Sequence, residues 1–311
     1  MPSINPISFA NLSGNLRLAQ MISMELGLLL RDSVSLRNTP YVEYCGSING
    51  MGSNTIRKRL AGLGRTAMNQ IAEGGTASAV ALDVETADVT VARQELAYAM
   101  TDLANMSQFG QDIDPIVIAN SMAAAYDARF MELTVAAGSF TATKGSNSQA
   151  FSTDAFFEGI YSLERADSER GANGPFVAVL ASKALTELQT DLRNESSNSI
   201  SLMQPVADML RARPQGMVGT LFGVDIYKTS HITDNGSSGF DNLMWSAGAL
   251  GYADGSVGQI LGADGQVQAG PVTVEFVRDG LSATTTVLGH GYLGIAKIID
   301  AKGVIIKSKL S

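Results

Sequence analysis

The chain has 311 residues, of which 45% are hydrophobic and 17% are charged. This composition is typical of a globular protein with a sizeable core and excludes disorder of the whole chain. The formal net charge of −8 argues against nucleic-acid binding through phosphate contacts, because the field of the protein would repel a polyanion. The single cysteine, Cys45, cannot form an intrachain disulfide, which is consistent with folding in a reducing compartment.

The first predicted element is an amphipathic helix within residues 17–31. Leu18, Ile22, Leu26 and Leu29 recur at helical spacing and share one face. Charged and amide side chains interrupt the apolar stretch, so it is neither a signal peptide nor a membrane span. Its polar positions are not rich in lysine or arginine, and we therefore expect it to pack on protein.

Residues 38–88 are dominated by glycine, threonine and short apolar runs. Val80, Leu82 and Val84 alternate with small or polar residues, which predicts a strand. Residues 41–44 are its expected partner, so that the segment would form a long two-stranded ribbon. Because an isolated hairpin is only marginally stable in water, the ribbon is expected to lie on its own body or on a neighbouring subunit.

The densest cluster of positive charge lies in the same ribbon, at Arg57, Lys58 and Arg59, followed by Arg65. One interpretation is a charged stretch that faces solvent. The other is an inter-subunit contact, in which these side chains bind carboxylates of a neighbouring copy and fix the ribbon there. The sequence leaves both interpretations open.

Two helices are predicted next. In the stretch "VARQELAYAMTDLANM", Leu96, Met100 and Leu103 are spaced for one helical face. A longer helix has Asp114 as its cap and ends at Gly138. Pro115 suits its first position. The apolar stripe of this long helix is formed by Met122, Tyr126, Phe130, Leu133 and Ala137. At about 1.5 Å per residue it would be roughly 34 Å long, a spine for the fold.

The middle of the chain alternates between helices and a strand. A polar loop precedes a helix through Phe156, Ile160 and Leu163. The run "PFVAVL" at 175–180 predicts a buried strand, and a helix capped by Ser182 follows it. The leucines of that helix are Leu185, Leu188 and Leu192. A further helix is predicted to begin near Pro205 and to end before Pro214.

From Met217 onward the sequence is mainly of the β type. Val272, Val274 and Phe276 alternate with polar or smaller residues, and Asp279-Gly280 is a hairpin signal. The triplet Ala-Asp-Gly occurs at 253–255 and again at 263–265, which predicts two turns around a small β excursion.

Few residues suggest catalysis. The chain has only two histidines, His231 and His290, and neither has a cysteine or glutamate at metal-ligand spacing. No nucleotide-binding, hydrolase or metalloprotease motif is present. The acidic groups Asp112/Asp114 and Asp83/Glu85/Asp88 select no chemistry by themselves. We therefore expect no catalytic residue, no cofactor and no metal site. An enzyme that uses these acids with a histidine, and a β-rich fibre subunit, are the alternatives from other classes.

The order of elements resembles the major capsid proteins of tailed bacteriophages, which have the Hong Kong ninety-seven type fold. The resemblance rests on residues 180–192, with a small-residue cap and a leucine-spaced helix, and on "LFGVDIYKTSHI" at 221–232. It also rests on "NLMWSAGALGYA", which contains Trp245, the only tryptophan. Under this resemblance Trp245 is a packing anchor.

The resemblance implies an α+β fold with five parts. These are an N-terminal arm at 1–45, an extended loop at 46–90, a peripheral domain with the spine helix at 91–180, an axial domain at 181–270 and return strands at 271–311. It implies a shell subunit that assembles into hexamers and pentamers around double-stranded DNA, with assembly in the host cytoplasm and residence in the virion. Scaffolding, portal and decoration proteins are further implied partners. The shell protein of encapsulin nanocompartments, which has the same fold, is the close alternative.

Overall fold

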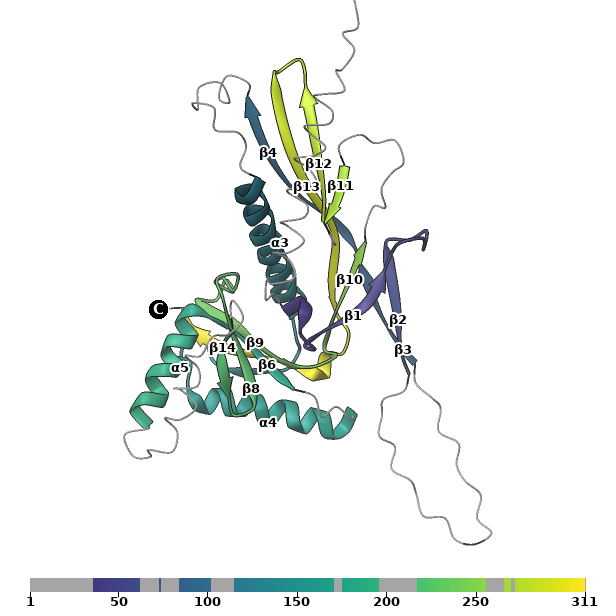
Figure 1. The fold of residues 1–311 in the computed structure, drawn as a ribbon. Helices are drawn as coiled ribbons and strands as arrows, with labels where there is room; N and C mark the ends of the chain where they lie inside the picture. Colours follow the sequence, from purple (N-terminus) through teal and green to yellow (C-terminus); the bar gives the residue numbers. More distant parts are fainter. Residues whose placement is uncertain are drawn as a thin grey trace, which may run out of the picture.

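A computed structural model describes residues 36–61, 73, 84–101, 115–170, 175–195, 217–255, 266–269 and 272–310. The fold is α+β, with two six-stranded sheets and a two-stranded ribbon. Figure 1 shows a tall sheet beside one long helix, a lower lobe with two helices, and the ribbon to one side. The predictions for residues 17–31, the helix near Pro205 and the triplet at 263–265 lie outside the described residues, as do Val80, Leu82, Leu103 and Asp114.

The tall sheet has the strand order β1-β10-β13-β12-β11, and β4 pairs with β13 as well. All its pairs are antiparallel except β1 with β10. Its strands are β1 (Val42–Ser47), β4 (Ala92–Thr101), β10 (Leu250–Gly255), β11 (Gln266–Ala269), β12 (Val272–Asp279) and β13 (Thr284–Lys297). The predicted hairpin at Asp279-Gly280 is confirmed, because it joins β12 to β13.

The helix predicted from Leu96 and Met100 is wrong, because these residues belong to strand β4. This strand pairs with β13 over ten residues, from Ala92 opposite Leu293 to Thr101 opposite Thr284. Gln94 and Leu96 are half-buried under the long helix, whereas Glu95 and Ala97 are exposed. The period-two burial of a half-covered sheet therefore outweighs the helical spacing, since long-range pairing overrides local pattern.

The long helix α3 (Pro115–Ala137) confirms the predicted spine and covers one face of the tall sheet. Met122, Tyr126 and Phe130 are buried on the predicted stripe, with Leu133 and Ala137 half-buried. Met122 lies so close to Gly289 of β13 that a methyl group on this glycine would collide with its sulfur. The helix therefore packs closely on the sheet at a glycine, where the strand has no side chain to keep the two apart.

The lower lobe is built on the sheet β5-β14-β9-β6-β8-β7, with α4 (Thr153–Arg170) and α5 (Ser182–Glu195) packed against it. Its strands are β5 (Thr143–Gly145), β6 (Phe176–Ala181), β7 (Met217–Leu221), β8 (Val224–Thr229), β9 (Gly239–Ser246) and β14 (Gly303–Lys309). The helix predicted through Phe156 is confirmed as α4, the buried strand predicted at 175–180 as β6, and the leucine-spaced helix predicted from Ser182 as α5. Among the most buried side chains are Trp245, Phe156, Leu163, Leu180, Leu188 and Met244.

The ribbon consists of β2 (Thr55–Ala61) and β3 (Val84–Thr90), paired from Thr55 opposite Thr90 to Ala61 opposite Val84. The expected pairing of residues 41–44 with the ribbon is wrong, because β1 pairs with β10 instead. The intervening Gly50 and Gly52 have positive φ values of 76° and 65°, so the chain turns between β1 and β2. The expected turn at 253–255 is also wrong, because these residues end strand β10.

Two 3-10 turns, at Leu36–Asn38 and Asp300–Lys302, complete the described elements. Among the helices that the structure describes, none is long and apolar enough to cross a membrane.

Candidate assembly surfaces

The base of the ribbon is fixed to the body by a small hydrophobic cluster of its own. Ile56, Val89 and Val91 are buried against Ala253, Ile298 and Ile299. The backbone N–H of Val91 donates to the carbonyl oxygen of Asn54 at 2.8 Å, which ties β3 to the start of β2. The described part of the ribbon therefore has a defined orientation relative to the tall sheet.

A glycine permits this close approach. At Gly294 of β13, an added Cβ would collide with the carbonyl group of Thr90 and with the backbone of Val91. Both neighbours are backbone atoms and cannot rotate away. Only glycine at this position lets the end of β3 lie directly on β13.

The structure places the predicted contact residues on two sides of β2. Arg57 binds Asp88 across the ribbon through two hydrogen bonds of 2.8 and 2.9 Å, and this pairing lowers the pKa of the Asp88 carboxyl group. Lys58 forms an ion pair with Glu43 of β1. Arg59 is exposed, and no ion pair joins it to another described residue. Arg65 lies outside the described residues. The inter-subunit role of all four stays a prediction.

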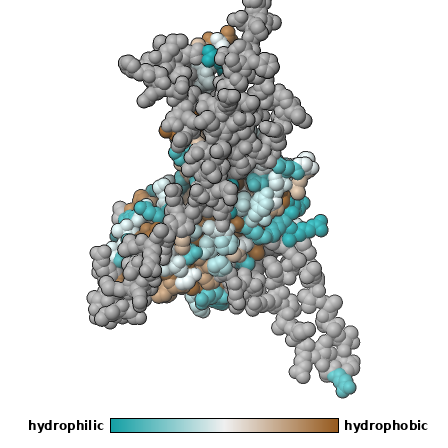
Figure 2. Space-filling model, viewed as in Figure 1, coloured by the Kyte–Doolittle hydropathy of each residue, from teal (hydrophilic) through white to brown (hydrophobic). Residues whose placement is uncertain are grey.

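A second surface was missed by the sequence analysis. The outer face of α4 carries Phe157 and Tyr161, which are 42% and 63% exposed. The ring of Phe157 contacts that of Phe222 at a centroid distance of 4.6 Å, and Phe222 is itself 43% exposed at the turn between β7 and β8. In the view of Figure 2, hydrophobic patches lie between hydrophilic ones on the described surface of the lower lobe. The signal in the sequence for this surface is the one-turn spacing of Phe157 and Tyr161, to one side of the buried stripe.

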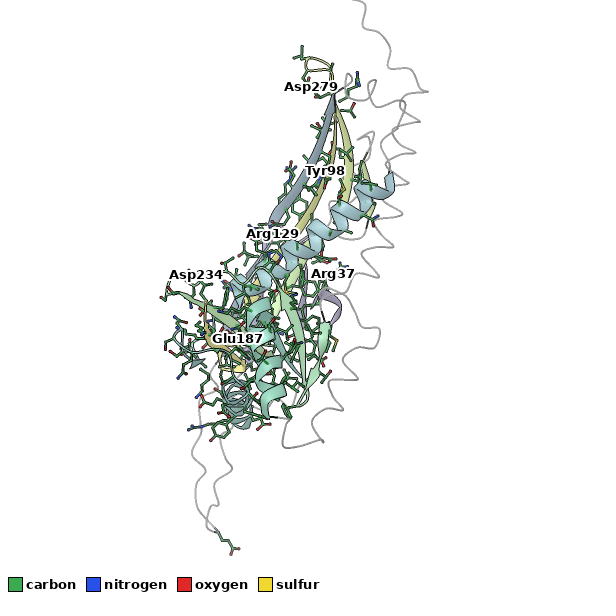
Figure 3. The ribbon with its side chains drawn as sticks, turned by 90° about the vertical axis from the view of Figure 1, so that its left-hand side faces the viewer. Arg37, Tyr98, Arg129, Glu187, Asp234 and Asp279 are labelled. Atoms are coloured by element: carbon green, nitrogen blue, oxygen red, sulfur yellow. The ribbon has the colours of Figure 1, made fainter. Side chains whose placement is uncertain are left out.

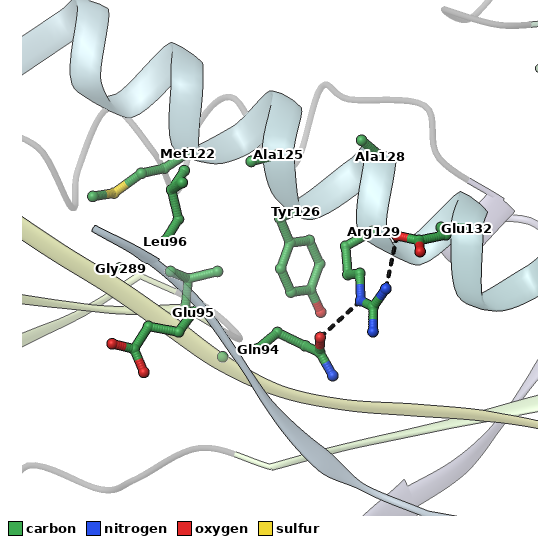
Figure 4. A pocket seen from close by; sticks show the side chains of 12 residues that line it. Gln94, Glu95, Leu96, Met122, Ala125, Tyr126, Ala128, Arg129, Glu132 and Gly289 are labelled. Carbon is green, nitrogen blue, oxygen red and sulfur yellow. Dashed lines mark hydrogen bonds and ion pairs between the residues drawn. The ribbon is translucent and has the colours of Figure 1, made fainter. Parts of the chain in front are cut away.

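A groove of about 500 Å³ lies between α3 and the strands β4 and β13 (Figure 4). One end has apolar walls, including Leu96 and Met122. At the other end, Arg129 donates from Nε to the side-chain oxygen of Gln94 at 2.8 Å and pairs with Glu132 at 2.7 Å. This volume is within the range of small-ligand pockets.

Tyr126 reaches into this groove from α3 (Figure 4). It is 7% exposed, and its hydroxyl group has no hydrogen-bond partner among the described residues. Burial is the main cause that raises the pKa of this phenol to about 12. The hydroxyl group is therefore neutral at physiological pH, and its burial without a partner is a local source of instability.

The two histidines are separate and neither belongs to a cluster of ligands. His290 is buried in β13, and its Nδ1 has no partner among the described residues. Burial, with the charge of Arg93, lowers the pKa of His290, against the opposing effect of Glu275 and Glu95. His231 lies after β8 and donates its backbone N–H to Thr229 at 3.1 Å. Within the described ranges, no group of three or more histidine, cysteine or acidic side chains could hold a metal ion.

Trp245 is fully buried, and its indole N–H donates to the carbonyl oxygen of Tyr41 at 3.0 Å. The Tyr41 hydroxyl group donates in turn to the Asp225 carboxylate of β8, and burial is the main cause that raises the pKa of this phenol. These contacts attach the segment before β1 to the lower lobe. The expectation that Trp245 is a packing anchor is confirmed.

The β12–β13 hairpin ends at the far end of the tall sheet, where Figure 3 labels Asp279. The carboxylate of Asp279 accepts the backbone N–H of Leu281 at 2.9 Å and the hydroxyl group of Ser282 at 2.6 Å. Leu281 is fully exposed. The loop thus has its own hydrogen bonds and holds an apolar side chain in solvent.

Comparison with known proteins gives a match at the level of structure. No protein-family model matches the chain, and no curated protein sequence matches it. Among solved structures, the cyanophage Pam1 capsid is similar with a TM-score of 0.59 and 14% identity, covering 90% of this chain and 93% of that chain. The capsid of Ralstonia phage GP4 is similar with a TM-score of 0.58 and 12% identity, covering 87% of this chain and 86% of that chain. A virus-like particle from Pyrococcus furiosus is similar with a TM-score of 0.53 and 11% identity, covering 92% of this chain and 98% of that chain.

At these identities the similarity establishes the fold. The chain has the fold of the tailed-bacteriophage major capsid proteins, the Hong Kong ninety-seven type, as its order of elements predicted.

Proposed function

We propose that this protein is the major capsid protein of a tailed bacteriophage and assembles with copies of itself into a closed shell around double-stranded DNA. The observation that carries the proposal is the fold match, which extends over 87% of this chain and 86% of the GP4 capsid chain. In this proposal the protein is a structural component of the virion and not an enzyme. Hexamers and pentamers of the chain, formed in the host cytoplasm, are the building units.

The ribbon supports this proposal on physical grounds. Its base is anchored on the tall sheet, yet Arg57 and Arg59 are exposed side chains on the outer side of β2. A two-stranded ribbon buries little apolar area by itself, so contact with a neighbouring copy would stabilise it. Arg57, Lys58, Arg59 and Arg65 remain the proposed inter-subunit residues, within an extended loop at 46–90.

Electron microscopy and analytical ultracentrifugation of the purified full-length chain test the proposal. The expected result is closed particles of megadalton mass, or hexamers and pentamers that form particles when a scaffolding protein is added. A 33 kDa monomer that stays monomeric across salt, pH and scaffolding conditions would contradict it.

A nanocompartment shell is the second candidate, because the match to the virus-like particle covers 98% of that chain. The two functions predict different contents of the particles. Particles isolated from the native source should contain nuclease-protected double-stranded DNA if the protein is a phage capsid protein. Particles that enclose protein cargo and no genome would instead support the compartment.

A further inference from the structure

The outer face of α4 presents aromatic rings and carboxylates together. Phe157 and Tyr161 are one helical turn apart, and Asp154 and Glu158 form a parallel row on the same exposed side. Glu158 has no ion pair with another described residue. The term α4 face is used below for Phe157, Tyr161, Asp154, Glu158 and the neighbouring Phe222.

The position of Phe222 is held at the expense of backbone strain. Its φ is 51°, in the left-handed region that non-glycine residues rarely adopt, and Gly223 follows with a φ of 80°. This two-residue turn, together with the ring contact to Phe157, keeps the phenyl group on the surface and not in the core. Strained backbone positions of this kind cluster at functional sites.

The chemistry of the α4 face fits a guanidinium group. Arginine binds carboxylates through its planar fork of N–H donors and stacks on aromatic rings, and aromatic residues with arginine form the centres of protein interfaces. The ribbon carries two such groups close together. Arg57 and Arg59 are exposed on the same side of β2, and Arg59 has no ion pair with another described residue.

The spacing of the arginines on β2 also agrees with that of the carboxylates on α4. Residues two apart on a strand are about 7 Å apart, and residues four apart on a helix are about 6 Å apart along its axis. The guanidinium group of Arg59, and the Nη1 group of Arg57 that does not bind Asp88, can therefore face the Asp154–Glu158 row. No ion pair of the described residues joins the ribbon to α4 within one chain, and the two lie on different parts of the molecule in Figure 1. A second copy can bring them together.

We infer that the α4 face is the docking surface for β2 of a second copy of this chain, with Arg59 bound to Glu158 beside Tyr161. This inference rests on the proposed function and names the surface that receives the ribbon. The contact is heterologous, because the donor and acceptor surfaces differ, and such contacts repeat into rings when their rotation closes.

A charge exchange in the full-length chain tests the inference. Arg59→Glu and Glu158→Arg are each expected to raise the protein concentration needed for particle formation about ten-fold or more, because each places like charges in contact. The double variant Arg59→Glu/Glu158→Arg restores the opposite charges and the net charge, and should assemble within about three-fold of the parent protein. Lys228→Glu, an exposed reversal elsewhere on the lower lobe, is the matched control and should leave assembly unchanged.

Disulfide trapping gives an independent readout that does not rely on charge repulsion. In a Cys45→Ser background, a mixture of Arg59→Cys and Glu158→Cys chains should form a disulfide-linked dimer under assembly conditions. Either variant alone should form far less. Normal assembly of both single charge variants, or absence of the mixed disulfide in assembled particles, would overturn the docking surface and leave the shell function intact. A parent chain that never assembles would instead contradict the proposed function.

Discussion

At the scale of single residues, the core contains both apolar side chains and buried polar atoms that lack a partner among the described residues. The buried roles of Met122, Tyr126, Phe130 and Trp245 follow from their spacing or their apolar context. The sequence does not predict the unpartnered hydroxyl group of Tyr126 or the buried imidazole of His290, because the burial of a polar atom depends on which distant strands cover it. The sequence likewise does not identify Arg93, Glu95 and Glu275 as the charges that act on His290.

The indole of Trp245 should contribute measurably to stability through its hydrogen bond to Tyr41. Trp245→Phe keeps an aromatic ring but leaves the buried carbonyl oxygen of Tyr41 without its donor. We expect a loss of about 1–3 kcal/mol in the free energy of unfolding, measured by urea denaturation. Tyr161→Phe, at an exposed position, should change stability by less than about 0.5 kcal/mol. Equal effects of the two variants would refute the role of the indole N–H group.

Protonation of His290 should destabilise the tall sheet. Its pKa in the folded state is lowered, so the unfolded chain, with a pKa of about 6.5, binds the proton more readily. This contribution to stability is present above pH 6.5 and is lost as the pH falls from there through the folded-state pKa. Thermal unfolding between pH 8 and pH 5 should show this loss in the parent chain, and His290→Gln should lack it. A pH profile shared by both proteins would rule out His290 as the source.

At the level of elements, prediction succeeded where local pattern and tertiary packing agree. The helices α3, α4 and α5, the strand β6 and the β12–β13 hairpin were all found from apolar spacing, caps and turn residues. Prediction failed for β4, whose Leu96 and Met100 fit a helix. It also failed for residues 41–44, which were expected to pair with the ribbon. Both errors concern pairing between segments far apart in the chain, such as β4 with β13, which no local pattern encodes.

The docking of the ribbon on β13 should depend on Gly294. Gly294→Ala places a methyl group against backbone atoms of Thr90 and Val91, so the end of β3 must move away. We expect a loss of about 1–3 kcal/mol in stability and faster amide hydrogen exchange at Ile56 and Val89. Gly280→Ala is the matched control, because an added Cβ there meets no atom within 4 Å. Unchanged exchange in Gly294→Ala would show that the ribbon does not need this close approach.

At the level of the whole molecule, the described chain combines self-contained packing with surfaces that its own residues leave uncovered. The lower lobe and the tall sheet share one hydrophobic core that includes Tyr41, Phe130 and Trp245. The aromatic residues on α4 and Leu281 at the hairpin tip stay exposed. Exposed aromatic clusters of this kind are typical of protein–protein interaction surfaces.

Folding and assembly should therefore separate when the ribbon is shortened. Ala61 and Val84 are paired, so residues 62–83 can be replaced by an Asn-Gly turn that closes the hairpin directly. We expect this variant to unfold within a few degrees of the parent chain and to form no particles in ultracentrifugation. Normal particles from the shortened chain would contradict the role of the extended loop, whereas an unfolded product would show that residues 62–83 also stabilise the monomer.

The continuity between β3 and β4 has a mechanical consequence. Only Val91 separates the two strands, and β4 then runs along β13 through ten paired residues (Figure 1). A pull on the ribbon along β3 is directed along the axis of β4 and loads its hydrogen bonds to β13 in shear. In that geometry the bonds resist together, whereas a peeling force would break them one after another. Tension between adjoining subunits would thus be borne by the β4–β13 pair of the tall sheet.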